Sequence, residues 1–300
     1  MLEQQIQKVD RFQREHSQLA FIYAVYKKSS EDKVSSLAAL FAYYALFSIF
    51  PLLLVMVSVL GVLLTKDSSL RTQIVNSALA NFPIIGPQLK SSVHSLTGNG
   101  VGIGIGTVTL LLASRCLASL AIRALNDVWN VPDSRRMGFP KSVLNQLLWT
   151  VTVGVGVTVS TFFSTYASLP LFVGVAVAFG INALTFTLAA RVILGKAVSV
   201  RQHLVGSVLA AFLWGLLQAF GAVLIERDLS HASSTYGFFA IVIGLCTWMY
   251  LQAYLTLLCA EADVVRDKRL WPRSVVRADP TEGDRRSEAF RLKQITAGPT

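Results

Sequence analysis

Six long apolar stretches follow one another along this chain; polar segments separate them, except that only Pro170 lies between the third and the fourth. They run from Leu37 to Leu64, Val101 to Leu125, Val143 to Leu169, Leu171 to Ala190, Leu204 to Ile225 and Phe238 to Ala260. A bilayer core about 30 Å thick is crossed by roughly 20 apolar residues of helix, and the first stretch contains no charged residue. The pattern predicts an all-α polytopic membrane protein whose six transmembrane helices form one bundle.

Part of the third stretch follows a different pattern. Residues 151–160 read VTVGVGVTVS, an alternation that is typical of a β-strand in a water-soluble protein. Inside lipid, only helices and closed barrels satisfy every backbone polar group. Because this segment lies within a long apolar run, we expect it to be helical.

The polar ends and one long loop complete the predicted organisation. Residues 1–36 are expected to form a cytoplasmic segment at the membrane interface, and residues 37–265 the six-helix transmembrane domain, whose outside loop, 65–100, carries short amphipathic helices. The basic tail, 266–300, is expected to be disordered and cytoplasmic. The N-terminal residues lack the pattern of a cleaved signal peptide, so we expect the first apolar stretch to act as an uncleaved anchor.

Basic residues are unevenly divided between the two sides that six spans define. Of the 27 lysines and arginines, 21 lie in the termini and in the regions after the second and fourth spans, and Arg123 lies just inside the adjoining end of the second span, which makes 22 on that side; four lie on the other side, and Arg115 lies deep within a span. Lys and Arg accumulate in cytoplasmic loops. We therefore expect both termini in the cytoplasm.

Composition narrows the class of partner. The chain is 53% hydrophobic and only 15% charged, whereas soluble domains usually carry about 25% charged residues. Its net charge of +10 could indicate nucleic-acid binding, but the basic residues follow the loops and form no patch with interleaved aromatic residues. We expect membrane lipids, through their anionic headgroups, as partners, and no nucleic acid; self-association into a homo-oligomer is left open.

Arg115 is the most informative polar residue within a predicted span. Placing an arginine at mid-membrane costs about 2.5–3.5 kcal/mol on insertion scales, so its side chain should face the bundle interior and find partners. Arg115, Ser119 and Asn126 fall near one helix face. With polar residues of nearby positions and other spans, they form a candidate site for an anionic lipid headgroup or solute: Arg115, Ser119, Asn126, Arg123, Gln218, Tyr43 and Tyr44.

The alternative for the cytoplasmic end of this face is a set of structural ion pairs or a gate. Arg123 and Asp127 have the i,i+4 spacing of a helical ion pair, and the last span ends in Glu261 and Asp263. Arg123 and Glu261 are expected at similar depth, where they could pair. A binding site and a helix-locking ion pair both remain open at this point.

Sequence motifs for catalysis are missing. The chain has no HExxH, CxxC, GxSxG, Walker or GxGxxG pattern. Its four histidines lie on different segments, and its three cysteines fall within predicted spans. We expect no metal, no cofactor and no enzymatic activity.

Three segments together resemble the YihY/BrkB family of bacterial inner-membrane proteins. They are AYYALFSIFPLLL from Ala42 to Leu54, ALNDVWNVP from Ala124 to Pro132, and YGFFAIVIGLCTWMYLQAYLTLLCAEAD from Tyr236 to Asp263. Where the family often has Gly before the Ala-Glu pair and Asn two residues after the Glu, this chain has Cys259 and Asp263. The resemblance implies a six-span protein of the bacterial inner membrane; some members carry a virulence-factor label and others a ribonuclease label.

The residues favour a transport-like role, in which a polar face of the bundle binds or moves an anionic amphiphile, lipid or solute. The alternative is a structural or assembly protein whose buried polar residues only pack helices. A membrane-bound hydrolase is the third class, and the sequence offers it neither a carboxylate cluster for metals nor an acid–base set. The substrate stays open.

Overall fold

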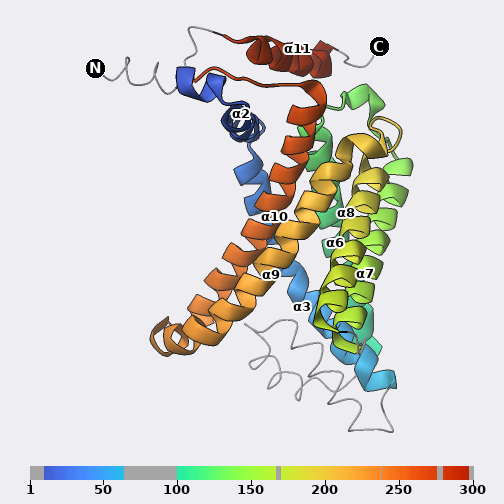
Figure 1. Ribbon diagram of the computed structural model, residues 1–300. Helices are drawn as coiled ribbons and strands as arrows, with labels where there is room; N and C mark the ends of the chain where they lie inside the picture. Colours follow the sequence, from blue (N-terminus) through green and yellow to red (C-terminus); the bar gives the residue numbers. More distant parts are fainter. Residues whose placement is uncertain (1–9, 64–99, 167–169, 237, 276–279, 297–300) are drawn as a thin grey trace. The chain divides into compact units, whose positions relative to one another are not determined.

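Every regular element of the computed structural model is a helix within the part of the chain that it describes, which comprises residues 10–63, 100–166, 170–236, 238–275 and 280–296 (Figure 1). The elements are α2 (Ser17–Glu31), α3 (Val34–Leu63), α6 (Gly100–Val128), the short 3₁₀ helix η1 (Asp133–Arg135), α7 (Lys141–Tyr166), α8 (Leu171–Leu194), α9 (Val200–Tyr236), α10 (Phe238–Lys268) and α11 (Glu282–Thr296). The predicted all-α class is confirmed, and the alternating segment 151–160 is helical, within α7.

The long helices match the six predicted apolar stretches one to one. Within α6, α7, α8, α9 and α10 lie five segments long and apolar enough to cross a membrane, and α3 contributes a shorter described apolar segment, Val34–Ile49. The predicted outside loop falls almost wholly on residues 64–99, which lie outside the described part. The helices therefore agree with a polytopic membrane protein of six spans.

Side chains on these helices are arranged for a lipid environment. On α7, large apolar residues point outward, with Leu144 and Val151 each 60% exposed. Where helices meet, small residues are buried instead, among them Ala20, Ala118 and Ala124. Small residues let helix backbones approach closely in membranes. At Gly156 of α7, an added Cβ would collide with the side chain of Thr185 on α8, so this helix pair needs a glycine there.

The chain divides into two compact units. The first unit comprises 1–38, 118–215 and 253–300, and the second comprises 39–117 and 216–252. In the second unit, the rings of Tyr43 and Tyr44 meet edge to face at 5.5 Å between centroids, and the Trp248 ring occupies the space beside Gly221. The first unit contains α2, α7, α8, α11 and the adjoining ends of α3, α6, α9 and α10.

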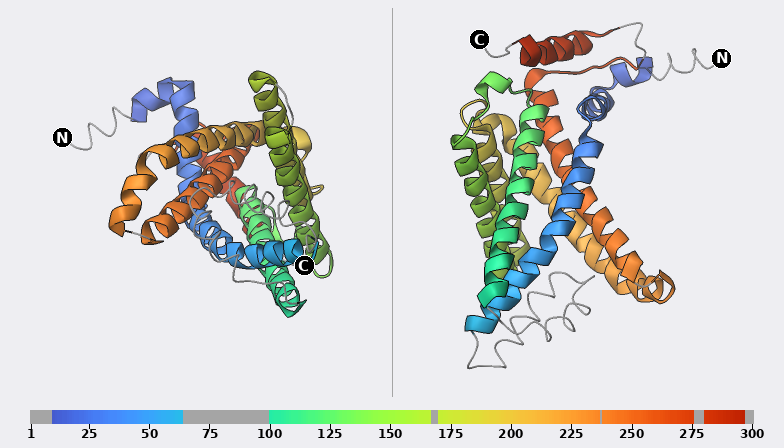
Figure 2. Two further views of the ribbon diagram at one scale, coloured as in Figure 1. Left: turned by 90° about the horizontal axis from the view of Figure 1, so that it is seen from below. Right: turned by 180° about the vertical axis from the view of Figure 1, so that it is seen from behind.

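Within the first unit, α11 and α2 lie at the same end as the C-terminus of α10 (Figure 2). Asp284 of α11 accepts hydrogen bonds from Lys27 Nζ of α2 at 2.9 Å and from Arg273 Nε, just after α10, at 2.7 Å. Arg273 also donates to Glu31 of α2 at 2.6 Å. These charged contacts hold the C-terminal helix against the N-terminal one.

The C-terminal tail differs from its prediction: residues 266–300 were expected to be disordered, but Glu282–Thr296 form the helix α11. Its first turn is capped locally, because Thr281 Oγ1 accepts from the Asp284 backbone N–H and the Asp284 carboxylate accepts from the Thr281 backbone N–H, a reciprocal arrangement that stabilises helix starts. The Asp284 carboxylate also accepts hydrogen bonds from Lys27 and Arg273, which attach the start of α11 to the rest of the unit. The tail's composition indicated disorder because these long-range partners leave no periodic pattern in the sequence.

Candidate functional site

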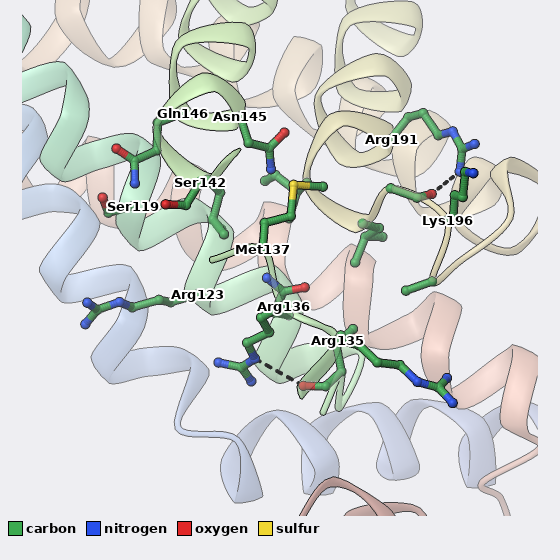
Figure 3. A pocket seen from close by; sticks show the side chains of 17 residues that line it. Ser119, Arg123, Arg135, Arg136, Met137, Ser142, Asn145, Gln146, Arg191 and Lys196 are labelled. Carbon is green, nitrogen blue, oxygen red and sulfur yellow. Dashed lines mark hydrogen bonds between the residues drawn. The ribbon is translucent and has the colours of Figure 1, made fainter. Parts of the chain in front are cut away.

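A cavity of about 890 Å³ opens in the first unit where four segments come together (Figure 3). The C-terminal part of α6, the connection from α6 to α7, the start of α7 and the end of α8 with its following turn supply the walls. The lining residues are Ser119, Ile122, Arg123, Asn126, Val131, Arg135, Arg136, Met137, Ser142, Asn145, Gln146, Arg191, Ile193, Leu194, Gly195, Lys196 and Ala197.

The chain reverses sharply after α6 and thereby brings basic residues to the cavity. Asn130 has a positive φ of 47°; its N–H bonds to Asp127 O, and the N–H of Val131 bonds to Asn126 O. This pair of bonds around a left-handed residue is the Schellman ending of a helix, and Asn tolerates the left-handed conformation better than most residues. The short helix η1 follows and places Arg135 and Arg136 beside the end of α6.

A second helix ending supplies the opposite wall. The helix α8 stops at Gly195, which has φ 53° and whose N–H bonds to Arg191 O at 3.0 Å. The Arg191 guanidinium donates to the carbonyl oxygens of Gly195 and, at 3.2 Å, Val198. A cation at a helix C-terminus interacts favourably with the negative end of the helix dipole. Arg191 therefore both faces the cavity and fixes the turn that carries Lys196.

The cavity wall is rich in positive charge. Five of its residues are basic and none is acidic. Arg136 is held by Asp127, which accepts from Arg136 Nη2 at 2.7 Å, and by the Val131 carbonyl. The side chains of Arg123, Arg135 and Lys196 make no hydrogen bond or ion pair with any other residue that the structure describes. Neutral donors and acceptors, such as Asn145 and Gln146, line the same space.

A second charged cluster in the same unit is built around Lys28 of α2. Its Nζ donates to Glu261 Oε2 at 2.7 Å, Asp32 Oδ2 at 2.6 Å and the carbonyl of Val128 at 2.8 Å. An ammonium group has three donors, so all of them are used. Lys28 is 2% exposed and Glu261 is fully buried. The cluster ties α2 to the ends of α6 and α10.

This cluster corrects the pairing that was predicted between Arg123 and Glu261. Glu261 pairs with Lys28 and not with Arg123, which lines the cavity. Asp127 pairs with Arg136 and not with Arg123. The physical reason is that α2 packs a lysine against the end of α6, where the Val128 carbonyl lacks a helical partner. In the sequence, Lys28 looked like one more basic residue of an interfacial segment.

Asp263, the fourth residue of the predicted gate, packs α10 against α9. Its Oδ1 accepts from the backbone N–H of Gly206 at 2.7 Å. A Cβ at Gly206 would collide with the Asp263 carboxylate and with the Cys259 carbonyl. Only glycine therefore allows this close contact of carboxylate and helix backbone.

The predicted binding face is divided by the structure. Ser119, Arg123 and Asn126 line the cavity. Arg115, Gln218, Tyr43 and Tyr44 belong to the second unit and are not among its lining residues. Four further basic residues of the cavity were not predicted as site residues: Arg135, Arg136, Arg191 and Lys196. Each lies within a few residues of a helix end on the same predicted side, and this placement is the signal that could have indicated them.

Comparison with known proteins places the chain in a family of membrane proteins. A protein from Pseudoalteromonas atlantica described as "UPF0761 membrane protein" is 25% identical over 206 residues, which cover 65% of this chain and 68% of that protein. One of the same description from Alteromonas mediterranea is 24% identical over 209 residues, covering 65% of this chain and 70% of that protein. No solved structure matches. The family model described as "Virulence factor BrkB" matches residues 25–282, and the chain therefore belongs to the BrkB family.

Proposed function

We propose that this membrane protein has a transport-like role in which the basic cavity binds the anionic headgroup of a membrane amphiphile and helps it to move across the bilayer. The observation that carries the proposal is the set of cavity cations, of which Arg123, Arg135 and Lys196 have no partner among the described residues. Cations left without partners around one concave space are available to an anion from outside the chain.

The cavity has the size and chemistry of a ligand site. Ligand pockets usually measure about 300–1,000 Å³ and carry a few convergent polar groups. Arginine's planar fork suits the oxygen atoms of phosphate and carboxylate groups, which it binds through two parallel hydrogen bonds. The amides of Asn145 and Gln146 could bind neutral oxygen atoms of the same headgroup.

The surroundings favour an amphiphile over a water-soluble anion. On α7, Ser142, Asn145 and Gln146 line the cavity, whereas Leu144, Leu147 and Leu148 are exposed large apolar residues next to them. One helix thus offers a polar face for a headgroup and an adjoining apolar face along which acyl chains can lie. The distribution of basic residues along the chain supports a cytoplasmic opening of the cavity.

A structural or assembly role is the competing proposal. It predicts that charged side chains pair with one another, as Lys28 and Glu261 do. Arg136, which pairs with Asp127, fits that role, but Arg123, Arg135 and Lys196 do not, because no acidic side chain of the described residues pairs with them.

Movement of lipid can be measured in liposomes that contain the purified protein. A tail-labelled fluorescent phosphatidylglycerol is placed in both leaflets, and dithionite bleaches only the label that reaches the outer leaflet. With the wild-type protein, we expect labelled phosphatidylglycerol from the inner leaflet to be bleached faster than phosphatidylcholine that carries the same label. Arg123→Gln with Arg135→Gln should slow this exposure at least tenfold.

The matched control is Arg201→Gln with Arg285→Gln, which removes the same charge from two exposed residues that do not line the cavity. It should leave the rate unchanged. Bleaching no faster than in protein-free liposomes would favour the structural role, and equal loss in both double variants would show that only overall charge matters.

A further inference from the structure

We propose that the ligand of the basic cavity carries two or more phosphate-like groups on its headgroup, so that its charge exceeds that of a phosphate diester or monoester. This inference rests on the proposed function and specifies the class of ligand. It follows from the number of cavity cations, their positions and the continuation of the cavity into a second space.

The number of cations is too large for one phosphate. Five basic residues line the cavity, and the Asp127 carboxylate compensates one of them, Arg136. A phosphate monoester carries about −1.5 to −2 charges at neutral pH. One such group leaves at least two of the remaining four cations without compensation. Two phosphate groups would bring the cavity close to neutrality.

The cations also lie in two places. In the view of Figure 3, Arg123 and Arg136 are drawn towards one side of the cavity and Arg191 and Lys196 towards the other. The two groups come from different helix ends, the end of α6 with its connection and the end of α8 with its turn. A headgroup with two anionic groups can present one of them to each set of cations.

A neighbouring cavity extends the basic surface. It measures about 450 Å³ and shares Val131, Arg135 and Ala197 with the first. Lys268 and the ring of Phe290 from α11 line it; Lys268 Nζ lies 5.7 Å from the ring centroid and pairs with Asp267 Oδ2 at 2.7 Å, so that Arg135 is the uncompensated cation of this second space. Arg135 thus stands at the junction of two spaces that both carry cations. A headgroup with more than one anionic group can follow this junction.

A matched series of three probes tests the inference. Farnesol, farnesyl phosphate and farnesyl diphosphate share one apolar tail and differ only in the number of phosphates. Their equilibrium binding to the purified full-length protein in neutral detergent is measured at one salt concentration, because charge interactions are screened by salt. We expect the diphosphate to bind at least tenfold more tightly than the monophosphate, and farnesol to bind weakest.

The variant Lys196→Gln removes a cation from one side of the cavity only. Lys196 is exposed and has no partner in the described part of the chain, so the variant should keep the thermal unfolding midpoint of the wild type. It should lower the affinity for the diphosphate at least fivefold, change that for the monophosphate less than twofold, and so reduce the difference between the two probes. Arg285→Gln, on the exposed face of α11, should change neither affinity.

The possible outcomes separate this inference from the proposed function. If both phosphates bind equally and farnesol binds more weakly, the inference is wrong while the anion site stands. If all three bind equally, the anion site itself is wrong. A third outcome is that the diphosphate binds more tightly than the monophosphate while Lys196→Gln and Arg285→Gln lower its affinity by the same factor. In that case the whole basic surface attracts the diphosphate, and its assignment to this cavity is wrong.

Discussion

Lys28 and Arg135 are both basic residues beside helix ends of the same unit, but their surroundings differ. Lys28 is buried and uses all three of its donors on Glu261, Asp32 and the Val128 carbonyl. Arg135 is exposed and lines two cavities, and its guanidinium makes no hydrogen bond or ion pair with the described residues. The first arrangement holds helices together, and the second leaves a cation available. Charged residues in this protein can therefore be sorted by whether the chain itself compensates them.

The largest effect on stability is expected from breaking the charged cluster around Lys28. Lys28→Met leaves the buried Glu261 carboxylate and Asp32 without their cation, and removal of one partner of a buried ion pair typically costs about 3–5 kcal/mol. Denaturation in mixed micelles should show a loss of this size in the free energy of unfolding. Lys33→Met, which changes an exposed lysine five residues away, is the control and should cost less than about 0.5 kcal/mol.

A double-mutant cycle with Glu261→Leu makes this test sharper. Because the two residues are in contact, the loss in Lys28→Met with Glu261→Leu should be smaller than the sum of the single losses. Strictly additive losses would contradict the pairing in the structure.

A smaller loss is expected where Asp263 meets Gly206. Gly206→Ala forces a methyl group against the Asp263 carboxylate and the Cys259 carbonyl, and overpacking of this kind costs about 1–3 kcal/mol. Gly215→Ala on the same helix is the matched control, because an added Cβ there meets nothing within 4 Å. Thermal unfolding in detergent should show a lower midpoint for the first variant and an unchanged or higher midpoint for the second; equal midpoints would contradict the close contact.

The contacts that hold α11 should depend on pH. Burial by itself would raise the pKa of Asp284, but hydrogen bonds from Lys27 Nζ, the Ser274 backbone N–H, Arg273 and Thr281 lower it well below the usual range for an aspartate. A lowered pKa in the folded state means that the stabilisation is complete above the unfolded value, about 3.9. It is lost progressively as the pH falls from there towards the folded value.

A nitroxide on a cysteine introduced at Ala289, in a cysteine-free background, reports whether α11 stays attached. The label should be immobile at neutral pH and become mobile only well below pH 4. Asp284→Asn should release the helix at neutral pH, whereas Glu288→Gln, which changes an exposed residue on the same helix, should not. An immobile label in Asp284→Asn at neutral pH would show that other contacts hold α11.

The membrane helices could be predicted from the sequence because their signal is local. In the described residues, each predicted apolar stretch coincides with one long helix, and the alternating segment 151–160 is helical because backbone hydrogen bonds must be satisfied inside lipid. Of the predicted binding face, Ser119, Arg123 and Asn126 line the cavity, whereas Arg115, from which that face was predicted, does not.

The pairing of charges could not be predicted, because it depends on contacts between distant segments. Lys28 and Glu261 are 233 residues apart, and Arg273 and Glu31 are 242 apart. The pairing of Arg123 with Glu261 was predicted because both residues were expected at the same depth in the membrane. Equal depth does not show which helices are neighbours, and here Lys28 of α2 pairs with Glu261 instead. Likewise, Arg135 and Lys196 reach one cavity only because two helix endings with positive φ at Asn130 and Gly195 turn the chain there.

The central claim, that the cavity cations serve a ligand and not the fold, is tested most directly by ligand-induced thermal stabilisation. A ligand that binds only the folded state at about 100 times its Kd adds about 2.7 kcal/mol of stability. The unfolding midpoint of the purified protein is measured with and without phosphatidic acid added to neutral detergent, for the wild type, Arg123→Gln with Arg135→Gln, and the control Arg201→Gln with Arg285→Gln. All three should unfold at the same temperature without lipid, and only the cavity variant should lose most of the shift that lipid produces. A cavity variant that is already less stable without lipid, or that shifts as much as the wild type, would contradict the claim.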